Sequence, residues 1–186
     1  HRRVITAAHA ACVAAMYGRQ NMREHAVLNY QRDGQACSAQ EFYDMACDPM
    51  RHVVVEACAG AGKTWVLVAR MARALWLGAA PDSILAITFT KKAASEMRER
   101  LLKDLAAWAG LDDVALREQL ALRGLHGVDA AGLARARGLH ADLLASDRAV
   151  QVRTFHSWFA QLLRHAPMEV FRTLNLPAQH ELLEDD

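Results

Sequence analysis

The chain has 186 residues, of which 53% are hydrophobic and 23% are charged, and its formal net charge is +1. These proportions are those of a globular domain, and they exclude a disordered or collagen-like chain. No apolar run reaches the roughly 18 residues of a membrane-spanning helix, so we expect no membrane segment. A net charge near zero gives no sign of nucleic-acid binding, which therefore has to be argued from local sites.

The N-terminal segment, residues 1–35, is assigned to an extension that precedes the main domain. Residues 1–21 are basic and rich in alanine, as many targeting segments are, but His9 interrupts the apolar stretch and no cleavage site follows. Met22 is a candidate natural start, with the residues before it an upstream read-through. The four cysteines form no Cys-x-x-Cys pair, and the nine histidines lack the spacing of metal ligands. We expect a cytoplasmic protein with reduced thiols and no metal site built from protein ligands alone.

The first predicted strand covers residues 52–57, a short β-branched segment typical of a strand that is buried on both faces of a parallel sheet. A glycine-containing loop follows, and then a helix over 64–77 that ends at Gly78. This helix is apolar on nearly every side, so we expect it to be largely buried. After a turn at 81–83, a second strand is predicted over 84–89 and a second helix over 92–108, which Gly110 closes.

The remaining part of the chain continues the alternation of strands and helices. Residues 111–148 are predicted to form two or three short helices, 150–154 a third strand, 157–165 a helix that Pro167 stops, and 181–186 an interrupted helix. This order is typical of an α/β fold with a parallel sheet flanked by helices. Right-handed crossovers would place the loops after the strands at the carboxyl edge of the sheet, where such folds bind ligands.

A phosphate-binding loop follows the first predicted strand. It consists of Ala57, Cys58, Ala59, Gly60, Ala61, Gly62, Lys63 and Thr64. It departs from the common Gly-x-x-x-x-Gly-Lys-Ser/Thr pattern only at its first position, where alanine replaces glycine. Glycines let backbone N–H groups approach phosphate oxygens, and the N-terminus of the following helix adds further donors. A mere glycine turn with a surface lysine does not explain both the pattern and its position.

The side chains of this loop indicate the ligand. Lys63 would bridge the β- and γ-phosphates of ATP, and the Thr64 hydroxyl would be a ligand of Mg²⁺. Cys58 lies inside the loop, where we expect it only to fill space. The sequence therefore predicts binding of ATP together with Mg²⁺.

Two later segments extend the pattern. Residues 88–101 (TFTKKAASEMRERL) and 154–157 (TFHS) follow the second and third predicted strands. With the phosphate loop, and in this order, they resemble motifs Ia and Ib of UvrD/Rep-like superfamily 1 DNA helicases. Residues 46–49 and 54–65 are most similar to AddA/RecB-type ATP-dependent helicase–nuclease subunits. The resemblance spans 36–165 and implies a P-loop NTPase fold of the RecA-like type, so we assign 36–186 to an incomplete first lobe of the helicase ATP-binding domain.

The resemblance also implies contact with single-stranded DNA at both segments. The implied DNA-binding residues are Thr88, Phe89, Thr90, Lys91, Thr154, Phe155, His156 and Ser157. These residue types suit the task, because phenylalanine rings stack on bases, hydroxyl groups bind phosphates and a lysine adds charge. Packing of both phenylalanines in the core stays open as an alternative, as does an ordinary polar role for His156 at a helix start.

The helix after the second strand also carries local positive charge. Residues 91–103 contain five basic side chains and only two acidic ones. For Arg98, Arg100 and Lys103 we favour an ordinary solvated helix face. The local charge therefore adds little to the DNA-binding prediction beyond Lys91.

Adenine recognition is a point at which the chain departs from the family, which uses a glutamine upstream of the phosphate loop. In the family's register this position falls on Phe42, while Gln40 lies two residues earlier and Gln31 and Gln35 lie farther upstream. Gln40 is therefore our candidate adenine contact. The stretch 111–148 is longer than in plain UvrD-type helicases, and we interpret it as a helical insertion, either an accessory of a subfamily or a scaffold.

Hydrolysis of ATP also needs carboxylates that hold Mg²⁺ and activate water, and usually an arginine finger. Only residues 182–186 resemble the corresponding strand, and they supply two apolar residues where four are typical. We therefore expect an N-terminal fragment of an ATP-dependent DNA helicase for repair or recombination, with the second lobe, any nuclease domain and a possible second protein of the assembly outside it. On its own it should turn over little ATP. A P-loop small-molecule kinase and a non-catalytic nucleotide-binding remnant are the alternatives.

Overall fold

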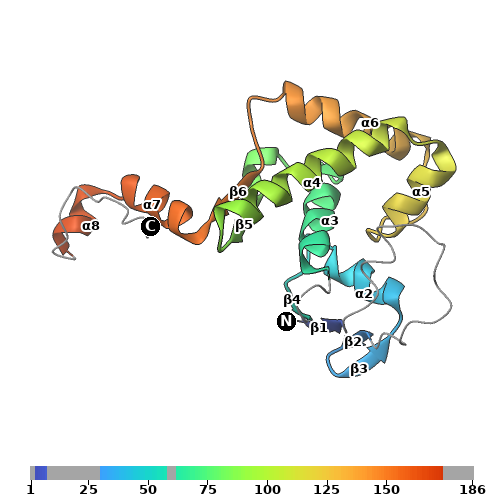
Figure 1. Ribbon diagram of the computed structural model, residues 1–186, viewed down its shortest axis with the longest axis horizontal. Coiled ribbons are helices and arrows are strands. Elements are labelled where there is room, and N and C mark those ends of the chain that lie inside the picture. Colours follow the sequence, from blue (N-terminus) through green and yellow to red (C-terminus); the bar gives the residue numbers. More distant parts are fainter. Residues whose placement is uncertain (1–2, 8–29, 58–61, 174–186) are drawn as a thin grey trace.

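The computed structural model describes residues 3–7, 30–57 and 62–173 as a mixed α/β fold (Figure 1). Its strands are β1 (Arg3–Ala7), β2 (Tyr30–Arg32), β3 (Gln35–Cys37), β4 (Val53–Ala57), β5 (Leu85–Thr88) and β6 (Gln151–Thr154). Its helices are α2 (Ala39–Ala46), α3 (Lys63–Trp76), the 3-10 turn η2 (Pro81–Ser83), α4 (Lys91–Gly110), α5 (Asp113–Ala121), α6 (Ala130–Ala145), α7 (Phe155–Arg164) and α8 (Met168–Thr173). The predicted strands and helices between residues 52 and 165 are thus all present, and none of the described helices is long and apolar enough to cross a membrane.

The ends of three helices show how local sequence sets these boundaries. Gly78, just beyond α3, has a φ of 94°, a conformation that glycine adopts without strain. Helix α4 was predicted to end at residue 108 and to be closed by Gly110. It instead includes Gly110 as its last residue, and Leu111 is its C-cap. Helix α7 begins at Phe155, two residues before the predicted start, because the Thr154 hydroxyl accepts a hydrogen bond from the Ser157 N–H and caps the helix.

The strands do not form the single parallel sheet that was expected. Among the described residues there are two sheets, one with the order β3-β2-β1-β4 and one in which β5 pairs with β6. Strand β4 pairs in parallel with β1, and β5 pairs in parallel with β6, but β4 and β5 are not bonded to each other. An apolar pattern indicates a strand without specifying its neighbour, which explains the error. The carboxyl ends of β4 and β5 therefore do not lie on one continuous sheet edge.

Strand β4 is also not buried on both faces as predicted. Its exposure alternates, with Val54 39% exposed, while Val53, Val55 and Ala57 pack against an aromatic cluster. Alternation is expected where only one face of a strand is covered. The proposed boundary after residue 35 falls inside the β2–β3 hairpin, in which Gln31 faces Ala36.

Two hydrophobic clusters hold the described residues together. The larger one lies between α3, α4, α5, α6 and β6 and contains the fully buried side chains of Leu101, Trp108 and Leu120. The smaller one joins α2 to β2 and to the start of α3 through Tyr30, Phe42 and their neighbours. Helix α3 belongs to both clusters, as its apolar sequence predicted, although Leu67 is 42% exposed.

The helical segment 111–148 is packed into the larger cluster. Leu116 and Leu133 are at most 1% exposed. The Arg123 guanidinium is buried between two indole rings, 5.4 Å from the centroid of Trp65 and 5.0 Å from that of Trp108. It also forms an ion pair of 2.6 Å with Asp104. This segment is therefore joined to the helix that follows the phosphate loop, whereas α7 and α8 extend away from the rest of the fold (Figure 1).

Candidate nucleotide and nucleic-acid sites

The described part of the phosphate loop has the geometry that its sequence requires. Ala57 ends β4, Gly62 precedes α3 with a φ of 81°, and Lys63 and Thr64 are the first two helical residues. A left-handed residue at this point requires glycine, because a Cβ atom would be strained there. Cys58, Ala59, Gly60 and Ala61 lie outside the described residues.

The Lys63 ammonium group donates a hydrogen bond of 2.6 Å to the carbonyl oxygen of Ala57 at the other end of the loop. Lys63 is exposed and Thr64 is half-buried at the N-terminus of α3. A cation, a hydroxyl group and unsatisfied N–H donors at a helix N-terminus form a donor set that fits a nucleotide phosphate and its Mg²⁺ ion. Mg²⁺ would neutralise charge on the phosphates, and residues 182–186, the incomplete match to the carboxylate-bearing strand, lie outside the described residues.

The candidate adenine contact is engaged within the protein. The Gln40 amide nitrogen donates to Asp44 Oδ1 at 2.8 Å and to the carbonyl oxygen of Ala121 at 2.9 Å. His126 Nε2 also lies 2.8 Å from Asp44 Oδ1, so α2 is tied to the segment after α5. Both amide hydrogens of Gln40 thus have acceptors, and an adenine base would have to displace one of them. Phe42, at the family's glutamine position, is a core residue that is 2% exposed.

Helix α2 holds Gln40 in place through a well-formed start. The Ser38 hydroxyl accepts from the Glu41 N–H, and the Glu41 carboxylate accepts from the Ser38 N–H. These two hydrogen bonds form a capping box. The bonds from Ser38 hold the pKa of Glu41 below its usual range.

The two segments proposed to bind DNA lie side by side. Strands β5 and β6 are parallel, and Thr88 is the direct partner of Thr154 in their register. Phe89 and Phe155 are the next residues of the two strands' sequences, so they leave the sheet at the same edge. Phe89 is 92% exposed, so it does not pack in the core of the described residues, and Phe155 is 46% exposed. The structure thus places two exposed aromatic side chains at neighbouring strand ends, as base stacking requires.

The hydroxyl groups at these strand ends are used as helix caps. Thr90 Oγ1 accepts from the Ala93 N–H at 3.1 Å, and Thr154 Oγ1 accepts from the Ser157 N–H at 3.1 Å. A hydroxyl group that accepts a bond from an N–H can still donate to a phosphate. Thr90 is exposed and can do so, whereas Thr154 is 9% exposed and Ser157 donates to the Thr154 carbonyl.

His156 is exposed at the start of α7, with its ring 6.3 Å from that of Phe155. The ring of Phe155 also lies close to the rings of Trp158 and Phe159 on the same helix. The sequence motif therefore continues as a cluster of aromatic side chains along the first two turns of α7. His156 can reach a ligand at the strand ends, and its position also fits an ordinary polar residue at a helix start.

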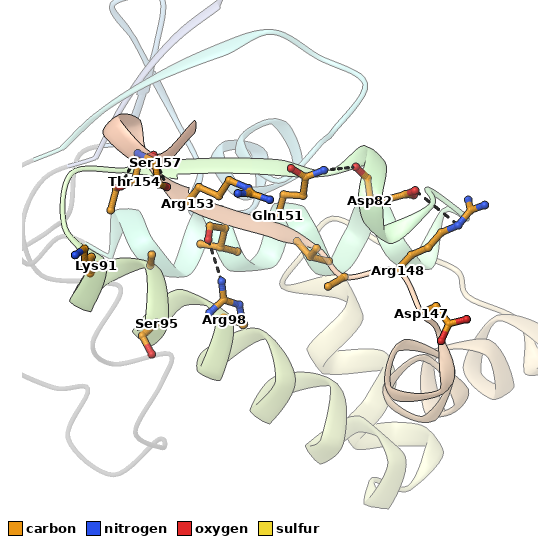
Figure 2. A pocket seen from close by; sticks show the side chains of 14 residues that line it. Asp82, Lys91, Ser95, Arg98, Asp147, Arg148, Gln151, Arg153, Thr154 and Ser157 are labelled. Atoms are coloured by element: carbon orange, nitrogen blue, oxygen red, sulfur yellow. Dashed lines mark hydrogen bonds and ion pairs between the residues drawn. The ribbon is translucent and has the colours of Figure 1, made fainter. Parts of the chain in front are cut away.

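A groove of about 810 Å³ runs between α4 and β6 and begins at these strand ends (Figure 2). Lys91, Thr154 and Ser157, three of the predicted DNA-binding residues, line one end of it. The groove also contains Ser95, Arg98, Arg148 and Arg153, which the sequence did not single out as ligand contacts. The spacing of Lys91, Ser95 and Arg98 on one helix face could have indicated them, but only together with the position of β6.

The sequence profile of the UvrD/REP helicase N-terminal domain matches residues 38–185. The chain belongs to this family. The match covers the phosphate loop, both strand ends and the helices of 111–148, so a single family relationship accounts for all three sequence motifs. Within the described part of this UvrD/REP domain, no three His, Cys, Asp or Glu side chains are grouped as metal ligands.

Several curated proteins are similar to this UvrD/REP domain over part of their length. An ATP-dependent helicase/nuclease subunit from Lactobacillus helveticus is 46% identical over 72 residues, which are 37% of this chain and 6% of that protein. The protein of the same name from Ligilactobacillus salivarius is 27% identical over 139 residues, or 75% of this chain and 9% of that protein. The exonuclease/helicase subunit RexA of Lactococcus lactis subsp. cremoris is 40% identical over 82 residues, or 42% of this chain and 7% of that protein. The chain thus spans less than a tenth of the length of these relatives.

Proposed function

We propose that the chain is the ATP-binding N-terminal part of an ATP-dependent DNA helicase, in which ATP hydrolysis drives movement along single-stranded DNA and duplex unwinding. The observation that carries the proposal is the family match over 38–185, which includes the phosphate loop and the paired ends of β5 and β6. In this proposal the described strands and helices are part of a RecA-like first lobe. The second lobe of such a motor is not part of residues 38–185.

On the nucleotide side, the loop from Ala57 to Thr64 surrounds the phosphates of ATP. Lys63 exchanges the Ala57 carbonyl for the β- and γ-phosphates, and Thr64 is a ligand of Mg²⁺. Gln40 contacts adenine after releasing Asp44 or Ala121. The exchange at Lys63 is favourable because a charge-assisted bond to phosphate is stronger than a bond to a neutral carbonyl.

On the DNA side, the exposed rings of Phe89 and Phe155 stack on bases of a single strand. Thr90, Lys91 and His156 bind the neighbouring phosphates or sugars, with Thr88, Thr154 and Ser157 holding the strand ends in register. The two functions lie on different elements of the domain. The nucleotide residues lie around β4 and α3, and the DNA residues lie around β5, β6 and the helices after them.

The named relatives support a narrower assignment. They are called helicase/nuclease or exonuclease/helicase subunits, and we propose that this chain belongs to such a cytoplasmic assembly in DNA repair or recombination, in which it pairs with a second, different protein. The helices of 111–148 are an insertion that braces the nucleotide side, because Arg123 contacts Trp65 directly after the phosphate loop.

Two titrations test the proposal on the 186-residue chain. A fluorescent ATP analogue should bind in the presence of Mg²⁺, and a labelled single-stranded oligonucleotide should bind with an affinity that falls as salt rises. Phosphate release should stay near background, because the sequence contains only an incomplete match, at 182–186, to the strand that carries the carboxylates needed for hydrolysis. Binding of ATP without any binding of DNA would favour a P-loop kinase instead. DNA-stimulated release by the 186-residue chain would contradict the expected inactivity.

A further inference from the structure

The groove between α4 and β6 extends away from the strand ends, and its lining differs in charge from the chain as a whole. Four basic side chains line it, Lys91, Arg98, Arg148 and Arg153, against two acidic ones, Asp82 and Asp147. The chain as a whole has a net charge of only +1. The lining side chains therefore carry a net excess of two positive charges (four basic minus two acidic), against one for the whole chain.

The charges are also ordered along the groove. The acidic pair lies at the end near η2, where Arg148 Nε is 3.7 Å from Asp82 Oδ2 (Figure 2). Lys91, Ser95 and Arg98 follow one another on α4 at spacings of four and three residues, which places them on one helix face. This face and the strand end with Thr154 form the other part of the groove, which contains no acidic lining residue. An anion entering at the strand ends therefore meets the basic part first.

Two guanidinium groups lie on either side of β6. Arg98 Nη2 donates a hydrogen bond of 3.0 Å to the Val152 carbonyl oxygen from the α4 side. Arg153 is the next residue of the strand, so its side chain points to the opposite face. Its buried Nε has no hydrogen-bond partner in the part of the chain that the structure describes. Arg98 and Arg153 both line the groove, and each guanidinium carries five N–H donors, more than the contacts named here use.

The hydrogen bond from Arg98 to the Val152 carbonyl argues against a peptide strand as the ligand of this groove. The Gln151 N–H donates to the Ile84 carbonyl of the β5 side, so the backbone groups of Val152 point to the outer edge of β6. Arg98 occupies the outward carbonyl of Val152, and β6 has only four residues. A charged side chain over a short edge strand is a feature that prevents strand addition. The groove is thus better suited to phosphates than to a peptide.

We propose that the α4–β6 groove binds the phosphodiester backbone of the single strand after it leaves the ends of β5 and β6, with Ser95, Arg98 and Arg153 as phosphate contacts. This inference rests on the proposed function, since Lys91 belongs both to the strand-end site and to the groove. The groove lengthens the path of the bound strand beyond the two phenylalanines. It also gives Arg98 a role besides covering the strand edge.

The test compares Arg98→Gln with Arg100→Gln on the 186-residue chain, using an oligothymidylate and fluorescence anisotropy. Arg100 is exposed on the same helix but does not line the groove, so it loses the same charge at a control position. Arg98→Gln should weaken binding about three- to tenfold and lower the slope of log affinity against log salt by about 0.7, as expected for one lost phosphate contact on a single strand. Arg100→Gln should change the affinity and the salt slope by less than half as much as Arg98→Gln does.

A second variant covers the case in which Arg98→Gln weakens the strand edge. Ser95→Asp introduces a negative charge into the groove at an exposed position and should weaken oligonucleotide binding by a similar factor without lowering the melting temperature. If Arg98→Gln and Arg100→Gln are equivalent and Ser95→Asp binds normally, while Phe89→Ala still weakens binding, the groove inference is wrong and the strand-end site stands. If the unaltered chain binds no oligonucleotide, the proposed function itself is wrong.

Discussion

The phosphate loop and the carboxyl ends of β5 and β6 differ in how their candidate residues are engaged. At the loop, Lys63 donates to a backbone carbonyl, and Gln40 uses both amide hydrogens within the protein. At the strand ends, Phe89 is 92% exposed and Lys91 is exposed at the start of α4. A nucleotide would have to replace existing hydrogen bonds, whereas a DNA strand would meet side chains that are already presented. Substitutions of the nucleotide residues should therefore lower both the stability of the fold and the affinity for the nucleotide. Substitutions of the DNA residues should lower mainly the affinity for DNA.

The largest effect is expected for Lys63→Ala, which removes the only charge contributed by the described part of the phosphate loop. The loss of a preorganised charge contact should weaken ATP binding by about 2–4 kcal/mol. DNA binding without nucleotide should not change, because Lys63 lies on α3 and the DNA residues lie beyond β5 and β6. Titration with a fluorescent ATP analogue measures the effect, with Lys103→Ala as a control for an exposed lysine on α4. Equal affinities of the two variants would contradict the phosphate-loop assignment.

The second prediction concerns the support of the nucleotide side by segment 111–148. Arg123→Met removes the ion pair with Asp104 and the contact with two indole rings, and it should lower the free energy of unfolding by about 1.5–3 kcal/mol. Urea unfolding followed by tryptophan fluorescence measures this. Arg135→Met is the matched control, because Arg135 also lies over an indole, that of Trp76, but is exposed. A loss as large in the control would show that burial of Arg123 is not what matters.

The third prediction concerns the strand ends. Phe89→Ala and Phe155→Ala should each weaken single-strand binding by about 1–3 kcal/mol through lost base stacking. The melting temperature of the Phe89 variant should stay the same, since this side chain is 92% exposed. Oligonucleotide anisotropy and thermal unfolding are measured together. Phe159→Ala provides the control, because Phe159 is 47% exposed one turn farther along α7.

The outcome of this set separates two explanations. Weakening by Phe89 and Phe155 but not by Phe159 would locate the interaction at the strand ends. An equal loss in all three variants would mean that the aromatic face of α7, rather than the two strand ends, binds DNA. An earlier melting transition with normal DNA binding would show that the rings are needed for folding only.

Much of the fold could be predicted because its signals are local. The apolar run before the phosphate loop, Gly78 after α3 and Pro167 after α7 each mark an element boundary through residues that are neighbours in sequence. The pairing of β4 with β1 and the separation of β4 from β5 depend on contacts between distant residues, and no pattern in the sequence encodes them. For this reason the expected single sheet is not found among the described residues, although the parallel pairing of β5 with β6 and the mixed α/β fold are.

The same distinction applies to the sites. The types and order of residues in the phosphate loop and at the strand ends indicated the family, which the profile match confirmed. The contact of Gln40 with Ala121 and the position of Arg123 between two rings join residues that are far apart in the chain, so they could not be foreseen. The exposure of Phe89 also had to come from the structure, because phenylalanine after a strand is equally consistent with a core position.

The smallest expected effect concerns Gln40, and it bears most directly on the contrast between the two sides. If Gln40 contacts adenine, Gln40→Ala should weaken ATP binding about two- to tenfold, which corresponds to a net hydrogen bond of about 0.5–1.5 kcal/mol, and should leave GTP binding unchanged. Gln35→Ala is the comparison, since Gln35 is an exposed glutamine upstream on β3. Competition of both nucleotides against a fluorescent analogue gives the two affinities.

The present bonds of Gln40 make a different result equally informative. Its amide donates to Asp44 within α2 and to the carbonyl of Ala121 at the end of α5, so its removal also frees a link between α2 and α5. If that link is its whole role, Gln40→Ala should lower the melting temperature and weaken ATP and GTP by the same factor. The ratio of the two affinities, and not the loss in either one, therefore decides the role of this residue. An unchanged ratio would leave the nucleotide side without a base-specific contact among the described residues of α2, and the phosphate loop would then account for nucleotide binding by phosphate contacts alone.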